Sequence, residues 1–215
     1  MTNGTRVHAE HFESLEQQAH AAHLGMWLFL ASEALLFSGL FALYTLARLE
    51  HPAGFHVGLQ HAEKTIGSIN TLILLTSSYS VASAVLALRA GKRSATLTLL
   101  AVTIALGLGF MGLKFFEYAR HFAEGIRPGG QGSFFAEFPV PGVAPFWTLY
   151  YVMTGLHVLH VAAGLSVLGW MSWKVARRTI LPPYDHPLAL AAMLWHLVDI
   201  VWIFLWPLFY LTERV

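Results

Sequence analysis

Two histidines three residues apart, His157 and His160, stand in an otherwise apolar stretch, GLHVLHVAAGL. This spacing places them one turn apart on a helix. Imidazole nitrogens bind iron, copper and zinc, so the pair suggests either a haem or metal site or hydrogen bonds to another helix. A second pair at the same spacing, His196 and Asp199 in LWHLVDIVWIFLWPLFY, could add ligands, with Asp199 the nearest polar partner expected for His196.

A metal site is the less favoured of these two interpretations. The chain has no cysteine, which excludes thiolate ligation of haem, copper or iron–sulfur clusters. It has no Glu-x-x-His pair of the kind that di-iron helix bundles use. Hydrogen bonds across a helix interface account for both pairs without a metal. An independent haem-binding membrane cytochrome that uses His157, His160 and His196 is the competing interpretation.

Two further groups of ionisable residues lie in apolar sequence. Glu33, in MWLFLASEALLFSGLF, has no basic residue within one turn. Because burial disfavours a charged carboxylate, we expect Glu33 either to handle protons or to be a protonated group bonded to a neighbouring helix. Lys114, Glu117 and His121, in LKFFEYARH, fall on one helical face. Their spacing favours an ion pair between Lys114 and Glu117 that balances the charge at a helix end.

Membrane helices must position these residues. Of the 215 residues, 56% are hydrophobic and only 12% are charged, against about 25% charged in soluble domains. Five apolar runs are long enough to cross roughly 30 Å of hydrocarbon as helices, and none has the period of two that a membrane barrel requires. The runs are 24–46, 66–88, 95–118, 145–173 and 188–211. We therefore predict an all-α, multi-pass membrane protein, in which a polar tail (1–23) precedes a bundle of five transmembrane helices (24–215).

The basic residues predict the orientation of the chain. Two short connections, RAGKR (89–93) and KVARR (174–178), each carry three positive charges and fall on the side of the N-terminus. Cytoplasmic loops are enriched in Lys and Arg, so we expect a cytoplasmic N-terminus and an external C-terminus. Lys174, Arg177 and Arg178 are either a site for an anionic phospholipid headgroup or simply the positively charged end of a helix. A net charge of +1 argues against nucleic acid as a partner.

Five segments, in order, resemble the five common helices of haem–copper oxidase subunit III. They are GMWLFLASEALLFSGLF, NTLILLTSSYSVASAV, GLGFMGLKFFEYARHF, YYVMTGLHVLHVAAGL and LWHLVDIVWIFLWPLFYL, and together they reach from about residue 22 to residue 211. The resemblance is to the shorter, five-helix bacterial form of the family. Six residues match its polar landmarks, and none of them is a metal ligand in the family: Glu33, Glu117, His157, His160, His196 and Asp199.

The resemblance implies an accessory subunit with no catalytic or redox centre of its own. Such a subunit packs beside subunit I of an oxidase that reduces oxygen and pumps protons, with haems and copper in the partner subunits. Subunit II, a small subunit IV and membrane phospholipid are the other expected partners, in a bacterial inner membrane. Supporting proton uptake, lipid binding and oxygen access are the implied roles. Glu rather than Asp at position 33 favours a cytochrome c oxidase; the alternatives are a quinol oxidase subunit III and a subunit-III-like protein associated with nitric oxide reductase.

Overall fold

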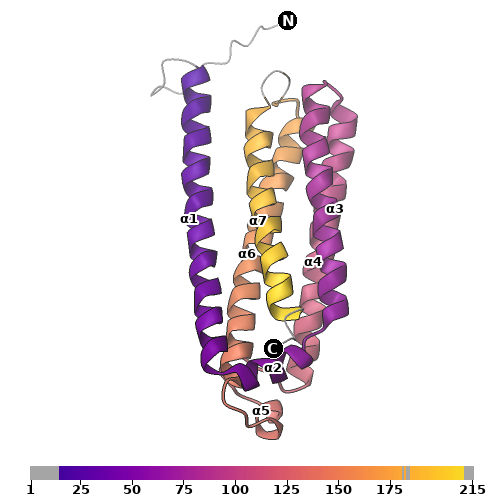
Figure 1. Ribbon diagram of the computed structural model, residues 1–215. Coiled ribbons are helices and arrows are strands. Elements are labelled where there is room, and N and C mark those ends of the chain that lie inside the picture. Colours follow the sequence, from indigo (N-terminus) through magenta and orange to yellow (C-terminus); the bar gives the residue numbers. More distant parts are fainter. Residues whose placement is uncertain (1–14, 181, 183–184, 211–215) are drawn as a thin grey trace, which may run out of the picture.

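The computed structural model describes residues 15–180, 182 and 185–210, which form seven helices (Figure 1). Two helices are short, α2 (Pro52–Gln60) and α5 (Ser133–Glu137), and lie near one end of the molecule. The five long helices are α1 (Leu15–Glu50), α3 (Lys64–Arg89), α4 (Arg93–Ala123), α6 (Val143–Ala176) and α7 (His186–Tyr210). All five are long and apolar enough to cross a membrane. The prediction of an all-α protein with five transmembrane helices is confirmed.

The long helices begin before the apolar runs that predicted them. The difference is largest for α1, which starts at Leu15, inside the segment expected to be a polar tail. Crossing the hydrocarbon takes only about 20 helical residues, and further polar turns keep their backbone hydrogen bonds in the headgroup region. Residues 1–14 of the expected tail, and Leu211 at the end of the last run, lie outside the described residues.

Four of the long helices form a bundle, and the fifth packs against its side. In the bundle α3 is adjacent to α4 and α7, and α6 is adjacent to α4 and α7. Helix α1 contacts α6 and α7 and stands at the edge of the molecule, as Figure 1 shows. The loops α3–α4 and α6–α7, which hold the two basic connections, lie at the end where α1 begins. This common end agrees with the expected topology, and the side of the membrane on which it lies stays a prediction.

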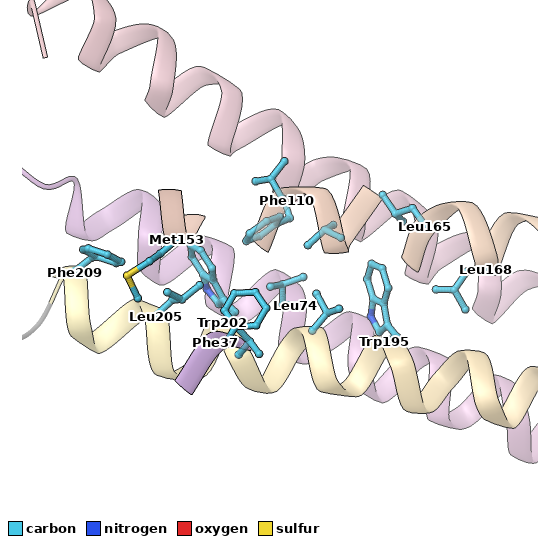
Figure 2. Close-up of a cluster of buried hydrophobic side chains, with 14 of the residues drawn as sticks. Phe37, Leu74, Phe110, Met153, Leu165, Leu168, Trp195, Trp202, Leu205 and Phe209 are labelled. Carbon is cyan, nitrogen blue, oxygen red and sulfur yellow. The ribbon is translucent and has the colours of Figure 1, made fainter. Parts of the chain in front are cut away.

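Tryptophans of α7 fill the centre of the bundle, and Figure 2 shows Trp195 and Trp202 pointing inward from that helix. Two glycines make room for Trp195. A Cβ on Gly164 of α6 would lie 2.9 Å from Trp195 Cε3, and one on Gly107 of α4 would lie 2.8 Å from Trp195 Cη2. Only a residue without a side chain fits at such distances. The two glycines therefore set how closely α4 and α6 approach α7.

Both buried indoles donate a hydrogen bond to α3. Trp195 Nε1 donates to Ser77 Oγ at 3.0 Å, and Trp202 Nε1 donates to Thr71 Oγ1 at 3.0 Å. The small hydroxyl side chains of α3 thus accept from the large side chains of α7, which satisfies polar groups that lipid could not satisfy.

Candidate functional site

Glu33 and His160 join α1 to α6. The Glu33 Oε2 atom lies 2.7 Å from His160 Nε2, and the two side chains are only 17% and 18% exposed. The other ring nitrogen, Nδ1, lies 2.8 Å from the carbonyl oxygen of Leu156, one turn earlier in α6. Phe37 of α1 packs edge-on against the imidazole, with ring centroids 5.3 Å apart. Because each residue lies near the midpoint of its helix, the pair lies near the middle of the membrane.

These hydrogen bonds determine where the protons of the pair lie. A carbonyl oxygen only accepts, so Nδ1 of His160 carries a proton and donates it to Leu156. Nε2 and the Glu33 oxygen must then have one proton between them, either on the carboxyl of a neutral pair or on the ring of an ion pair. Neither arrangement has a net charge, which limits the cost of ionisable groups at this depth. The pair can therefore hold one transferable proton.

His157, one turn before His160, turns further into the bundle. Its side chain is fully buried, with its ring centroid 5.5 Å from that of Phe110 and 5.2 Å from that of Trp202. Neither ring nitrogen has a hydrogen bond to any described residue. Of the two histidines, only His160 makes the bond between helices that the sequence suggested for both, because aromatic rings surround His157.

A second polar group lies where α4, α6 and α7 meet. The Lys114 ammonium donates to Glu117 Oε2 at 3.0 Å, to the Tyr150 hydroxyl at 3.0 Å and to the Tyr210 hydroxyl at 3.1 Å. Both tyrosine hydroxyls donate to Glu117 Oε1 at 2.7 Å. An ammonium has three N–H donors, so all three are used. The result is a closed network of one ion pair and two phenols.

This network corrects part of what the sequence suggested. The ion pair between Lys114 and Glu117 is present, but it is not a solvated helix end, since the two side chains are 1% and 0% exposed. A buried ion pair persists only when further hydrogen bonds satisfy it, and Tyr150 and Tyr210 provide them. These two tyrosines were missed because they lie 33 and 93 residues from Glu117 in the chain. Tyrosines occur in all four other apolar runs, so their presence alone did not single out these two.

Two neighbouring side chains extend the network toward the α2 end of the bundle. The Tyr118 hydroxyl and Thr154 Oγ1 are joined by a hydrogen bond of 2.6 Å between α4 and α6. His121 is buried, and its ring centroid lies 4.8 Å from that of Trp147 and 5.5 Å from that of Tyr150. Its nitrogens, like those of His157, bond to no described residue. The shared face of Lys114, Glu117 and His121 is therefore the buried face of α4.

His196 and Asp199 of α7 do not pair with each other. Nδ1 of His196 is joined to Ser78 Oγ of α3 by a hydrogen bond of 2.7 Å. Asp199 is 3% exposed and lies beside the same Ser78 hydroxyl, without a well-formed hydrogen bond to a described residue. The expectation that Asp199 is the partner of His196 is therefore wrong. Their spacing places both on one side of α7, but Ser78 of the adjacent helix bonds to the ring directly.

The histidines of the two motifs have different neighbours. His160 meets Glu33, His157 meets Phe110 and Trp202, and His196 meets Ser78. Across residues 15–180, 182 and 185–210, no three His, Asp or Glu side chains are grouped as metal ligands. The chemistry that the arrangement supports is hydrogen bonding and proton sharing between helices.

The basic residues at the end of α6 lie beside exposed aromatic rings. Lys174 Nζ lies 3.8 Å from the ring centroid of Trp170, and the Arg177 guanidinium carbon lies 5.5 Å from that of Trp173. Both tryptophans are 54% exposed. Arg178 follows the helix in a left-handed conformation, with φ of 58°. Exposed tryptophans next to cations are typical of a membrane–water interface.

Comparisons with known proteins agree over nearly the whole chain. A family model described as cytochrome c oxidase subunit III matches residues 4–213. The probable quinol oxidase subunit 3 of Staphylococcus epidermidis is 29% identical over 210 residues, 96% of each chain. The cytochrome bo(3) ubiquinol oxidase subunit 3 of Pseudomonas putida is 31% identical over 188 residues, 87% of this chain and 84% of the relative. Since the family match covers residues 4–213, which include all five membrane helices, this multi-pass membrane protein belongs to the subunit III family of haem–copper oxidases.

Proposed function

We propose that this chain is an accessory subunit of a proton-pumping terminal oxidase, with no redox centre of its own. It would pack beside subunit I in a bacterial inner membrane and stabilise it during aerobic electron transport, together with subunit II and a small subunit IV. The haems and copper of the assembly would lie in the partner subunits. The observation that carries this proposal is that four of the six residues that resemble the family's polar landmarks connect helices to one another. Glu33 reaches His160, Glu117 reaches Tyr150 and Tyr210, and His196 reaches Ser78.

Support of proton uptake is the specific role that the geometry favours. The Glu33–His160 pair holds one proton near the middle of the membrane, and both side chains are partly exposed rather than sealed in the bundle. A group that is to exchange protons with a neighbouring subunit needs such access. The buried Lys114–Glu117 network, with all its donors used, suits a structural role.

Lipid binding is proposed at the other polar surface of the chain. Lys174, Arg177 and Arg178 form a basic end of α6 beside Trp170 and Trp173. Basic clusters next to membrane helices attract anionic headgroups, while the exposed rings suit the interface. We assign an anionic phospholipid to this end of α6. A boundary layer of such lipids around the oxidase would serve the role in oxygen access that the family resemblance implies.

Two electron donors each have an observation in their favour. Glu rather than Asp at position 33 favours cytochrome c, and the names of the relatives from Staphylococcus epidermidis and Pseudomonas putida favour a quinol. The purified complex decides between them by its rate of oxygen uptake with reduced cytochrome c and with a short-chain quinol. Reduction of nitric oxide with no oxygen uptake would instead identify an assembly related to nitric oxide reductase.

The proposal is tested by purifying the assembly in a mild detergent through a tag on this chain. We expect mass spectrometry to find subunits I and II, and the complex to show a haem spectrum and take up oxygen. The matched control is the same chain purified in a detergent that separates subunits. A Soret band that stays with the separated chain would overturn the proposal and favour a haem-binding cytochrome.

A further inference from the structure

Helices α3 and α7 expose a continuous surface between them that we call the α3/α7 face. On each helix its side chains recur every three or four residues, so they form two parallel stripes, and hydrogen bonds join the helices beneath them. Most of the face is apolar, as a lipid-facing surface would be. Its members are Leu72, Leu75, Tyr79, His196, Ile200 and Ile203.

Tyr79 does not suit a lipid-facing position. Its side chain is 77% exposed, and its hydroxyl has no hydrogen bond to any residue that the structure describes. The residue lies near the middle of α3 (Lys64–Arg89), slightly toward the C-terminal end. Helical side chains lean toward the N-terminus, so the phenol leans back toward the middle of the membrane. A tyrosine at an interface could satisfy its hydroxyl with water, but hydrocarbon offers no partner.

His196 presents a second unsatisfied atom at the same depth. Its Nδ1 is bonded to Ser78, the residue adjacent to Tyr79, which places the ring level with Tyr79 on the neighbouring helix. Nε2 has no hydrogen-bond partner in the described part of the chain, and the side chain is partly exposed. The α3/α7 face therefore presents a phenol and an imidazole nitrogen together near mid-membrane.

Several exposed hydroxyls in the membrane helices differ from Tyr79 in this respect. Each of those named below donates to a carbonyl oxygen of its own helix and needs no external partner. Three on α1 do so, at distances of 2.7 to 2.8 Å: Ser32, Ser38 and Thr45. On α3, Thr76 donates to Leu72 at 2.8 Å. These hydroxyls are satisfied within their own helices, whereas the two polar atoms of the α3/α7 face are not.

We propose that the α3/α7 face is the surface on which a transmembrane helix of another oxidase subunit docks. That helix would carry, at mid-membrane, a side chain or free backbone carbonyl that hydrogen-bonds to Tyr79 and His196. The flanking side chains, Leu72, Leu75, Ile200 and Ile203, would pack against its apolar surface. This inference rests on the proposed function, which supplies the subunit. Acyl chains cover apolar side chains equally well, so the two polar atoms are what select a protein partner.

The test uses the complete oxidase with a photo-crosslinking amino acid in place of one residue at a time. The probe position is Tyr79, and the control is Leu108 of α4, which is 57% exposed at the middle of its helix. We expect Tyr79 to give an adduct with another subunit and Leu108 to give a lipid adduct. An adduct of Tyr79 with lipid alone, or with a second copy of this chain, overturns the inference.

A second measurement does not depend on crosslinking efficiency. The chain has no cysteine, so Tyr79→Cys introduces a single thiol, which we expect to react with a lipophilic maleimide only after the partner subunits are stripped away. Equal reactivity before and after stripping contradicts the inference. Tyr79→Phe should lower the amount of partner subunit that stays bound at a fixed detergent concentration by about threefold. This is the effect expected from the loss of one hydrogen bond within a membrane. Thr76→Val is its control, since that hydroxyl bonds within its own helix.

The two proposals fail in different ways. A chain that purifies without any other oxidase subunit overturns the proposed function and this inference together. A complex that contains the other subunits, but in which Tyr79 contacts only lipid, overturns this inference alone.

Discussion

Near the middle of the membrane, Glu33 Oε2 of α1 and His160 Nε2 of α6 lie 2.7 Å apart with one proton between them. Helix α1 is mostly exposed, so this bond is one of few polar contacts that hold it to the bundle. Another lies toward the α2 end, where the Tyr44 hydroxyl donates to the Leu208 carbonyl oxygen at 2.9 Å. The position of α1 thus depends on the same contact to which the proposed function assigns proton exchange.

Replacing Glu33 by glutamine should leave the oxidase assembled and active. The amide N–H of glutamine can donate to Nε2 of His160, so the contact survives while its transferable proton is lost. Co-purification of subunit I and the initial rate of oxygen uptake measure assembly and activity. Glu33→Leu is the contrasting variant, because it leaves His160 without the bond. Complete loss of assembly in Glu33→Gln would contradict the prediction.

Replacing Lys114 by methionine should be strongly destabilising. It leaves the Glu117 carboxylate fully buried without its counter-ion, and breaking a buried ion pair costs about 3–5 kcal/mol in the free energy of unfolding. Adding Glu117→Gln should recover much of the loss, since no net charge then remains. Titration with a denaturing detergent measures both variants. Arg120→Ala is the control, because its ion pair with Glu63 is part-exposed and should contribute less than about 1 kcal/mol.

Replacing Gly164 by alanine should destabilise the bundle by about 1–3 kcal/mol, the usual cost of overpacking. The new Cβ would lie 2.9 Å from Trp195 Cε3. The indole cannot move away easily, since Gly107 lies on its other side and Nε1 is bonded to Ser77. Gly155→Ala, in the same helix, has nothing within 4 Å of its new Cβ and should show no loss. Equal thermal stability of the two variants would refute this account.

Replacing Ser78 by alanine should remove the hydrogen bond of His196 and cost about 0.6 kcal/mol. Asp199→Leu leaves that bond in place and removes a buried carboxyl that lies beside Ser78 but has no well-formed hydrogen bond to a described residue. Burying an unbonded polar group is unfavourable, so we expect no loss of stability from Asp199→Leu. A double-mutant cycle of Ser78→Ala with His196→Ala measures the coupling directly. No coupling, with a large loss in Asp199→Leu, would show that Asp199 is the important partner.

Replacing Lys174 by serine should lower the amount of anionic phospholipid that co-purifies with the oxidase. The ammonium lies above Trp170 at the end of α6, where it can pair with a headgroup phosphate. Lys92→Ser is the matched control, because it is an exposed lysine of the other basic loop at the same end. Lipid analysis of the two purified variants separates a defined site from general attraction to positive charge. Equal lipid loss in both would favour general attraction.

Apolar length and loop composition were enough to predict the five membrane helices. A run of about 20 apolar residues has few alternatives in a membrane, since every backbone group must be bonded within the helix. The ends of the helices were less predictable. Helix α1 continues into polar residues from Leu15 onward, where hydropathy no longer signals a helix.

Both partners of a polar contact were identified only where they lie within one helix; for Glu33 and His160 the sequence suggested a bond to another helix but not the partner. The ion pair of Lys114 and Glu117 follows from their spacing, and it is present. The same reasoning failed for His196 and Asp199, because a neighbouring helix offered Ser78 instead. It could not identify Tyr150 and Tyr210, since helical spacing carries no information about residues on other helices.

The sequence alone establishes a five-helix subunit III. It does so through the order of its apolar runs, its lack of cysteine and its match to the family's polar landmarks. The tertiary structure alone decides which landmarks meet. It pairs Glu33 with His160 across 127 residues of sequence, buries His157 among aromatic rings and leaves Tyr79 facing outward. The physical reason is that helical geometry fixes the angles between side chains of the same helix. Which side chain of a neighbouring helix each of them meets is decided by how the helices pack.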